Sequence, residues 1–358
     1  MVTVSQRITR ALCAVVLGQL GWVGCKPELE GRPSLVEADR ILAIRSLPAE
    51  AKPKSAVSYE ALYVSPDGEL TGDALDWALC NRRKALTQSG TISKSCLFLE
   101  APSLELLGTG SHVDATLPPD ACETFGPTPR TPKPGEPNFR PVDPDTTGGF
   151  YQPVRVLGRS DEQLFASGMT RLACGLGGAT QEQAADFNRR YRVNENPKLD
   201  GLVLVHSDGS EEPFQDAASS LEALSVQRAE RVLLRASWAD CPSEPSCGDG
   251  ICSLGESDCP ADCAAGAAHG CTGSEPYLSF DAIVRSLNER REAIRVSWFA
   301  TGGRFDYERT GHAESDQPEA STENWWTAPV DSSEVLLWLV IRDDRGGVGW
   351  TSYRLRAE

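Results

Sequence analysis

Residues 335–341 read VLLWLVI, and this stretch decides the fold of the second half of the chain. Every side chain in it is apolar, so both faces of an extended segment would be buried, which is typical of a central β-strand. Residues 343–347 (DDRGG) are turn formers, and a second strand pattern begins at residue 348. The sequence therefore predicts a β-hairpin whose first strand lies at the centre of a sheet.

Strand patterns also precede this hairpin. Residues 231–238 (RVLLRASW) alternate, with Val232, Leu234 and Trp238 on one face, and residues 293–300 (AIRVSWFA) do the same. This alternation predicts strands with one buried face. At Trp325-Trp326, neighbouring strand residues point to opposite faces, so either both pack or an outward tryptophan is available to stack on a sugar; we favour packing.

The order of these segments resembles that of bacterial Ig-like or PKD-like sandwich domains. A strand with a tryptophan is followed by residues 326–329 (WTAP), an apolar strand and a Gly-rich turn into the last strand. The resemblance covers roughly residues 195–358 and implies a β-sandwich.

A similar scheme is present between residues 40 and 178. Residues 40–46 (RILAIRS), 57–64 (VSYEALYV) and 75–80 (LDWALC) are rich in strand formers, and Trp77 lies on the third of them. A tryptophan on the third strand resembles the immunoglobulin-like pattern. The predicted fold class is therefore mainly β, with two Ig-like β-sandwiches in tandem.

Two segments interrupt the strand pattern. Residues 117–144 contain nine prolines and are predicted to form an extended loop. At the end of this loop, residues 143–148 (DPDTTG) carry acids at alternate positions, as a Ca²⁺ loop does. Val154 stands where such a loop needs glutamate, so we predict a turn instead. Residues 179–194 form the predicted connector between the sandwiches, with a capping box at residues 180–183 (TQEQ) that begins a short helix.

Ten cysteines follow residue 25, an even number that predicts five disulfides in an exported chain. Metal binding is the alternative, but the cysteines are not arranged in paired CxxC motifs and histidines are few. We expect the pairs Cys80–Cys96, Cys122–Cys174 and Cys241–Cys271. The remaining four are Cys247, Cys252, Cys259 and Cys263.

Residues 241–271 form a disulfide-rich insertion in the second sandwich, since a segment so short cannot bury a core of its own. Its centre, CGDGICSLGESDCPADC at residues 247–263, resembles a short cysteine-rich repeat of secreted proteins. Two readings of its acids remain open: a Ca²⁺ site, or acids that solvate tight turns, which we favour. These acids are Asp249, Glu256, Asp258 and Asp262.

The N-terminal segment predicts export. Arg7 and Arg10 precede an apolar stretch at residues 11–23, which is shorter than the roughly 20 residues that span a bilayer, so residues 1–24 are predicted to be a signal peptide. Gly24-Cys25 resembles a bacterial lipobox, although Trp22 stands where leucine is usual. The resemblance implies that Cys25 is acylated and that residues 25–39 form a tether. Because Asp does not follow Cys25, it also implies an outer-membrane lipoprotein.

The net charge and the catalytic motifs that are missing reduce the number of function classes that fit the sequence. Without the signal peptide the chain has 33 basic and 51 acidic residues, and this negative excess argues against nucleic-acid binding. Motifs such as HExxH, the P-loop and GxSxG are missing from the sequence, which gives no cofactor prediction beyond the possible Ca²⁺.

In overall plan the chain resembles lipoproteins common in myxobacteria and related deltaproteobacteria, a likeness that implies location and architecture. We expect a non-enzymatic protein of the cell envelope, anchored in the membrane by its N-terminal lipid. It would serve as a binding, adhesion or scaffold module for a protein or glycan partner, on the periplasmic face or the cell surface. The alternative is a hydrolase that acts on envelope glycans through carboxylates that the sequence does not identify.

Overall fold

The apolar stretch predicted as a central strand forms β20 (Ser333–Arg342), and the turn after it leads into β21 (Val348–Ala357). The two strands pair antiparallel along their full length. β20 is buried on both faces, because Leu337 points into one core while Trp338 points into another. The predicted hairpin and its central strand are confirmed.

The computed structural model describes residues 32–358 with internal gaps, and residues from Pro33 onward form one compact unit. The predicted signal peptide and Cys25 lie outside the described residues. The gaps are residues 73, 86, 98–101, 130, 132–133, 135–143, 160–163, 221, 243–245, 249–251, 253–258, 264–269, 282 and 314–318.

The second sandwich consists of an inner and an outer sheet, each with five described strands, which enclose a core containing Trp298 and Trp326. The inner sheet of the second sandwich has the order β12-β21-β20-β16-β18, with β12 (Leu224–Val226), β16 (Ile294–Ala300) and β18 (Arg309–His312). The outer sheet of the second sandwich has the order β11-β10-β13-β19-β17, with β11 (Glu211–Pro213), β10 (Leu199–Val205), β13 (Arg231–Trp238), β19 (Ser321–Thr327) and β17 (Arg304–Phe305).

The first sandwich has the same plan, with a core that contains Tyr59 and Trp77. Its inner sheet joins β1 (Arg40–Leu47), β3 (Ala56–Ser65), β4 (Gly68–Glu69) and β7 (His112–Thr116). Its outer sheet has the order β2-β9-β8-β5-β6, with β2 (Glu50–Ala51), β9 (Phe165–Leu172), β8 (Tyr151–Gly158), β5 (Leu75–Cys80) and β6 (Leu104–Thr109).

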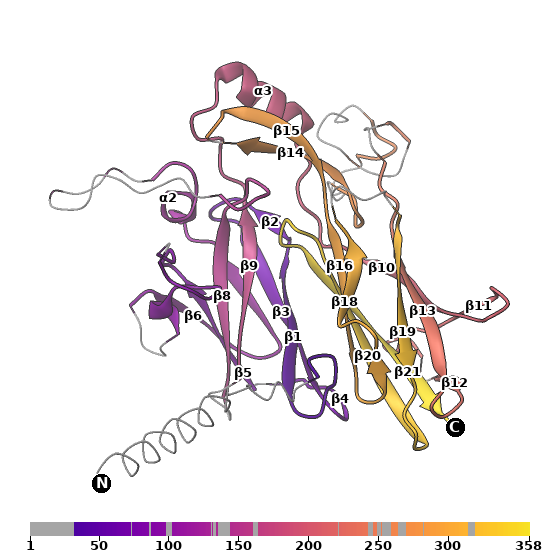
Figure 1. Ribbon diagram of the computed structural model, residues 1–358. Coiled ribbons are helices and arrows are strands. Elements are labelled where there is room, and N and C mark those ends of the chain that lie inside the picture. Colours follow the sequence, from indigo (N-terminus) through magenta and orange to yellow (C-terminus); the bar gives the residue numbers. More distant parts are fainter. Residues whose placement is uncertain are drawn as a thin grey trace, which may run out of the picture. The chain divides into compact units, whose positions relative to one another are not determined.

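A third apolar core lies between the two inner sheets, so the sandwiches are packed against each other rather than merely linked (Figure 1). Leu62 and Val64 on β3 face Trp338 and Val340 on β20 across this junction. β3 is therefore buried on both faces along part of its length, since Tyr59 and Tyr63 point into the first sandwich. The four sheets of the two sandwiches form four layers with three apolar cores between them.

The predicted tether of residues 25–39 is wrong for its described C-terminal part. Val36 is 1% exposed and belongs to the junction core. Its backbone N–H donates to the carbonyl of Ala300, at 2.9 Å, and Leu35 forms a parallel bridge with the same residue. The apolar side chains of Leu35 and Val36 and these backbone contacts with Ala300 dock this part of the chain against the end of β16.

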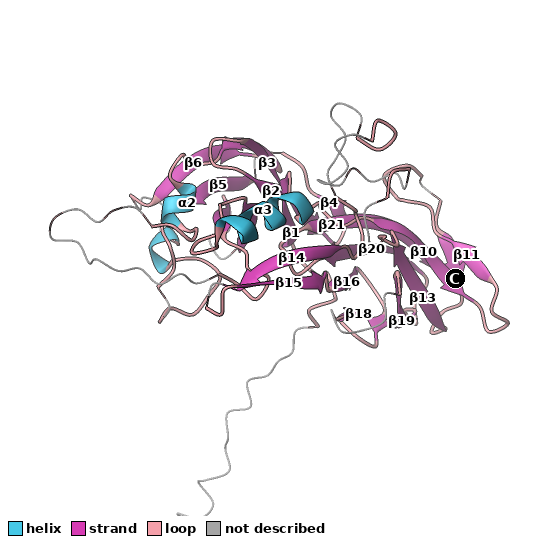
Figure 2. Ribbon diagram, turned by 90° about the horizontal axis from the view of Figure 1, so that it is seen from above, coloured by secondary structure: helices cyan, strands magenta, loops and turns pink. Residues whose placement is uncertain are grey.

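The connector and an additional hairpin lie together at one end of the first sandwich. Helix α3 (Gln181–Arg190) begins with the predicted capping box, in which Thr180 and Gln183 bond reciprocally. It lies beside the hairpin of β14 (Pro276–Asp281) and β15 (Ser286–Arg291), as Figures 1 and 2 both show. The side-chain amide of Gln183 donates to the carbonyl of Arg285 in the hairpin turn, at 2.7 Å. The sequence did not predict this hairpin.

Two further helices are short: η2 (Lys94–Cys96), a 3₁₀ helix, and α2 (Ala121–Thr124), within the Pro-rich loop. All ten cysteines from Cys80 onward are paired within the described residues. The pairs are Cys80–Cys96, Cys122–Cys174, Cys241–Cys271, Cys247–Cys259 and Cys252–Cys263.

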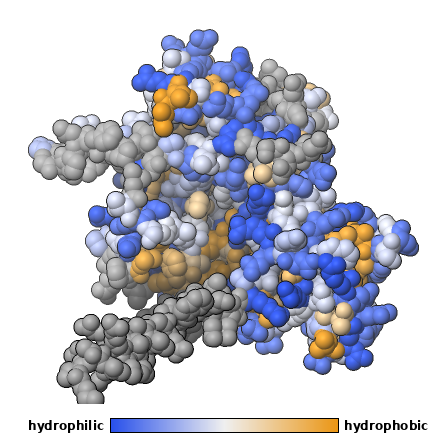
Figure 3. All heavy atoms as spheres, viewed as in Figure 1, coloured by the Kyte–Doolittle hydropathy of each residue, from blue (hydrophilic) through white to orange (hydrophobic). Residues whose placement is uncertain are grey.

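The predicted fold class is confirmed: the protein is mainly β, with two Ig-like sandwiches and a disulfide-rich insertion in the second. The insertion leaves β13 and returns to β14, as the Cys241–Cys271 pair shows. Polar side chains dominate the face drawn in Figure 3, which agrees with the acidic composition.

Candidate functional site

The turn between β20 and β21 places an arginine in the interior of the protein. The Asp343 carboxylate accepts the backbone N–H groups of Arg345 and Gly347, both at 2.8 Å, and this fixes the turn. The Arg345 side chain is 0% exposed. A turn residue of this type is normally solvated, so its burial requires partners from neighbouring elements.

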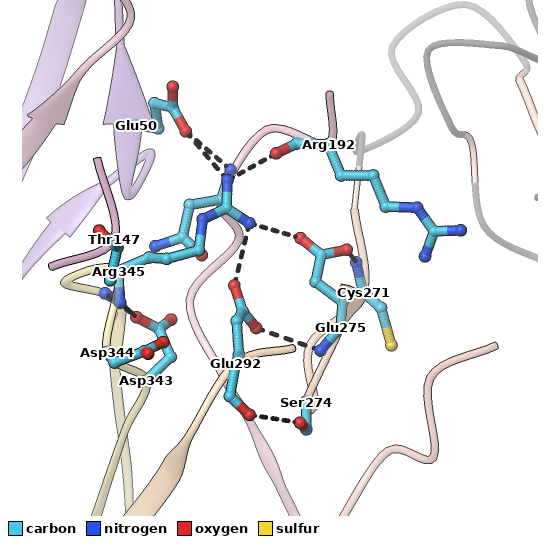
Figure 4. A network of polar contacts seen from close by, with 12 residues as sticks. Glu50, Thr147, Arg192, Cys271, Ser274, Glu275, Glu292, Asp343, Asp344 and Arg345 are labelled. Atoms are coloured by element: carbon cyan, nitrogen blue, oxygen red, sulfur yellow. Dashed lines mark hydrogen bonds and ion pairs between the residues drawn. The ribbon is translucent and has the colours of Figure 1, made fainter. Parts of the chain in front are cut away.

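Two glutamates from the segment between β13 and β16, which contains the disulfide-rich insertion, bind the Arg345 guanidinium. Nη1 of Arg345 donates to Glu275 Oε1 at 3.1 Å and to Glu292 Oε1 at 3.0 Å. Glu275 lies just before β14, where the backbone N–H of Cys271 donates to its other oxygen at 3.0 Å. Glu292 directly follows β15, and Figure 4 shows both side chains converging on Arg345.

The first sandwich and the connector complete the shell around Arg345. Nη2 lies 3.4 Å from Glu50 Oε2 on β2 and donates to the Tyr191 hydroxyl at 3.0 Å. The same hydroxyl lies 2.7 Å from Glu50 Oε2, and the backbone N–H of Asn194 donates to that carboxylate at 3.0 Å. The carbonyl of Arg192 accepts from Nη2 at 2.5 Å. One guanidinium therefore joins both sandwiches, the connector and the segment between β13 and β16.

A second buried guanidinium, that of Arg171 on β9, extends the network. Its Nε lies 3.7 Å from Glu50 Oε2, and its Nη1 donates to the Thr147 hydroxyl at 2.7 Å and to the Tyr151 hydroxyl at 2.9 Å. Gly149 is required here, because a Cβ at this position would overlap the Arg171 guanidinium. We call the Glu50, Arg171, Tyr191, Glu275, Glu292, Asp343 and Arg345 side chains the junction network.

Burial shifts the protonation equilibria of the acids in this network. It raises the pKa of Glu275 to about 7 and that of Asp343 to about 6, with Arg345 opposing both shifts. It raises the pKa of Glu292 well above its ordinary value, and Asp343 and Glu275 add to this shift. Burial alone would lower the pKa of Arg345, but Tyr191 and the surrounding carboxylates raise it, so the guanidinium stays charged.

A cavity of about 360 Å³ lies beside the junction network. Its walls come from the end of β9, the loop before β8, helix α3 and strand β14. Glu50, Arg171 and Tyr191 belong to both the cavity lining and the network. The cavity is the part of this region that a ligand could enter, because the Glu275 and Glu292 side chains are 0% and 1% exposed.

The predicted alternatives for Ca²⁺ are only partly covered by the structure. Asp249, Glu256 and Asp258 lie outside the described residues. Asp262 is buried, and its carboxylate accepts the backbone N–H of Gly248. It lies near Cys247 and Cys259, but both sulfurs are in a disulfide and offer no thiolate to a metal.

Two other sequence interpretations can be compared with the structure. The Asp145 carboxylate accepts hydrogen bonds from Thr147, Gly149 and Tyr151, as expected for a turn. The expectation that both tryptophans of Trp325-Trp326 pack is wrong for Trp325, which is 37% exposed, whereas Trp326 is fully buried. The Arg231 guanidinium lies 4.2 Å from the Trp325 ring centroid and covers one face of that ring.

The sequence did not reveal the junction network. Arg345 lies in a charged, Gly-rich turn that resembles a solvated loop, and Glu50 lies between two prolines. The acids of the network are scattered over almost 300 positions of an acidic chain, with Glu50 and Arg345 separated by 295 residues. They meet because β2, the β14–β15 hairpin and the β20–β21 turn come together in the folded chain.

Comparisons with known proteins give no family. No family model and no curated protein matches the sequence. Among solved structures, the D00-D0 domain of intimin aligns with 90% of this chain and 98% of its own, at 8% identity and a TM-score of 0.19. The C-terminal domain of the Streptococcus agalactiae AgI/II polypeptide BspA covers 89% of this chain and 99% of its own, at 10% identity and a TM-score of 0.23. Superpositions this loose carry no argument about function.

Location follows from the chemistry of the chain. The disulfides indicate an oxidising, extracytoplasmic compartment, because thiols stay reduced in the cytosol. In the part of the chain that the structure describes, every helix is too short or too polar to cross a bilayer.

Proposed function

We propose that the protein is a non-enzymatic binding module of the cell envelope, anchored to the outer membrane by a lipid on Cys25. The observation that carries this proposal is the contrast between a closed network and an open cavity. The carboxylates of Glu275 and Glu292 are at most 1% exposed, whereas the adjacent cavity of about 360 Å³ is partly open to solvent. Its volume lies within the range typical of small-ligand sites.

The same contrast weakens the alternative of a glycan hydrolase. That reaction needs two carboxyl groups that flank a sugar, one of them with a raised pKa. Glu275 and Glu292 have raised pKa values, but both oxygens that face Arg345 are bound to its guanidinium. A substrate would have to displace a buried ion pair before it reached either acid.

Crosslinking and affinity capture from intact cells test the proposal. The full-length protein with an affinity tag after Glu358 is compared with a Cys25→Ala variant. We expect metabolic labelling with a fatty acid, recovery in the outer-membrane fraction and a crosslinked envelope component. Cys25→Ala should lose the label, and labelling that persists in this variant would contradict the anchor.

A second assay tests the absence of catalysis. The purified protein is incubated with envelope glycan, and released reducing ends are measured for the wild type and for Glu275→Gln and Glu292→Gln. We expect no release above background. Release that both substitutions abolish would overturn the proposal in favour of the hydrolase.

A further inference from the structure

The cavity beside the junction network has walls that suit an apolar ligand. Four of its lining residues are aromatic: Phe150, Phe187, Tyr191 and Phe280. Phe187 and Tyr191 stack on each other along α3, with ring centroids 4.4 Å apart. The Tyr191 hydroxyl is bound to Glu50, so its ring rather than its polar group is available to the cavity.

Helix α3 lines the cavity and contributes no buried residue to a core. None of its residues is buried, and Phe187 is only half-buried although it is the largest apolar side chain of the helix. A phenylalanine on a surface helix normally packs into a core, because burial of its ring stabilises the fold. Phe187 instead lines a space of about 360 Å³ that remains partly open.

The charge of the cavity is set by one side chain. Three lining residues are charged: Glu50, Lys52 and Arg171. Glu50 and Arg171 form an ion pair at 3.7 Å and are 4% and 5% exposed. Lys52 is exposed at the rim, and its ammonium group has no hydrogen-bond or ion-pair partner among the described residues.

We infer that the cavity binds a small carboxylate with an apolar body, which rests on the binding function proposed above. The apolar body would lie against Phe187, Phe280 and the Tyr191 ring, and the carboxylate would meet Lys52 at the rim. The buried Glu50–Arg171 pair needs no ligand charge, so the unpaired ammonium decides the preferred sign. This chemistry fits a fatty acid or the C-terminus of an aromatic peptide.

Isothermal titration of the full-length protein in detergent with matched probes tests this inference. Decanoate, decanol and decylamine share one apolar chain and differ in head group, whereas N-acetylphenylalanine and its amide form the aromatic pair. We expect saturable binding of at least one carboxylate, weaker binding of its neutral analogue and the weakest binding for decylamine. The stronger of the two carboxylates identifies the source of the ligand.

Three variants locate the binding site. Lys52→Ala should weaken the carboxylate about two- to fivefold and leave the neutral analogue unchanged, as for an exposed ion pair. Phe187→Ala should weaken both probes about tenfold, because apolar contact is lost. Lys198→Ala, which removes an exposed lysine away from the cavity, should change neither.

Two results would overturn the inference: no saturable binding of either carboxylate, or binding that Lys52→Ala and Phe187→Ala leave unchanged. Lys52 is exposed, so its replacement should not affect folding, and thermal melting verifies this for each variant. If the carboxylates fail to bind while cells still yield a crosslinked partner, this inference fails and the proposed function stands. If a carboxylate binds but cells yield no crosslinked partner, this inference stands and the envelope partner of the proposed function is contradicted.

Discussion

The junction between the two sandwiches has an apolar part and an ionic part. In the apolar part, Leu62 and Val64 pack against Trp338 and Val340, and all four are at most 1% exposed. In the ionic part, Arg345 is equally buried but is held by carboxylates from three separate segments. Both parts exclude water, yet only one of them depends on protonation.

The difference teaches how the sandwiches acquire one fixed arrangement. Apolar contact between two sheets is non-directional and tolerates small shifts. A buried guanidinium tolerates none, because each displaced partner leaves an uncompensated charge. We therefore expect the apolar part to supply cohesion, and the junction network to select the relative position of the sandwiches and thereby to shape the cavity.

The largest expected effect comes from removing the centre of the network. Arg345→Met should lower the free energy of unfolding by about 3–5 kcal/mol, because the carboxylates of Glu50, Glu275 and Glu292 remain buried without their cation. Chemical denaturation measures the loss. Arg295→Met, at an exposed position of β16, is the matched control and should change stability by less than about 0.5 kcal/mol. Equal effects of the two substitutions would show that the buried guanidinium contributes no more to stability than an exposed one.

A truncation in the apolar part should cost somewhat less. Leu62→Ala removes a side chain that is 1% exposed, and we expect a loss of about 3 kcal/mol from lost contact and the cavity left behind. Denaturation at two pH values makes the comparison sharper. The effect of Leu62→Ala should be the same at both, since none of the side chains in this core titrates.

The fold could be predicted from the sequence further than the site could. Residues 335–341 are apolar without interruption, so their burial on both faces followed directly, and the alternation in residues 231–238 predicted β13. The β14–β15 hairpin was missed because β15 reads SLNERR, a polar run whose two sides are both partly solvated. Propensity gives little signal for such a strand.

The site was beyond the sequence for a different reason. A buried ion network is built from residue types that are normally exposed, so composition and periodicity assign each member to the surface. Glu292 follows two arginines, Arg290 and Arg291, and looks like part of a solvated charge run. Only the three-dimensional arrangement shows that it faces Arg345, at 3.0 Å.

The pH dependence of the free energy of unfolding also distinguishes the ionic part of the junction from the apolar part, with a smaller expected effect. The folded chain binds protons on Glu275 and Asp343 more tightly than the unfolded chain, since burial raises their pKa values to about 7 and about 6. Stability is therefore greatest below the ordinary carboxyl pKa and falls as pH rises through these values. Between about pH 5 and about pH 8 we expect the free energy of unfolding to fall by an amount on the order of a few kcal/mol.

Glu292→Gln provides the control for this pH effect. The amide resembles the protonated acid, so the variant should lose part of the pH dependence and should be more stable than the wild type at about pH 8. Thermal melting across this range measures both quantities. A slope that is unchanged in Glu292→Gln would show that Glu292 takes no part in the pH effect and would leave Glu275 and Asp343 as its source.

The smallest expected effect concerns a contact beside the apolar part of the junction, against which Trp350 packs. The Arg45 guanidinium on β1 lies 4.1 Å from the centroid of the Trp350 ring on β21, and it also bonds to Glu60. Arg45→Ala should cost about 1 kcal/mol, the sum of a partly exposed cation–π contact and a partly exposed ion pair. Arg45→Gln keeps much of the packing and removes the charge, so it should recover less than half of this loss. Full recovery would assign the contribution of Arg45 to packing of its side chain on Trp350 alone.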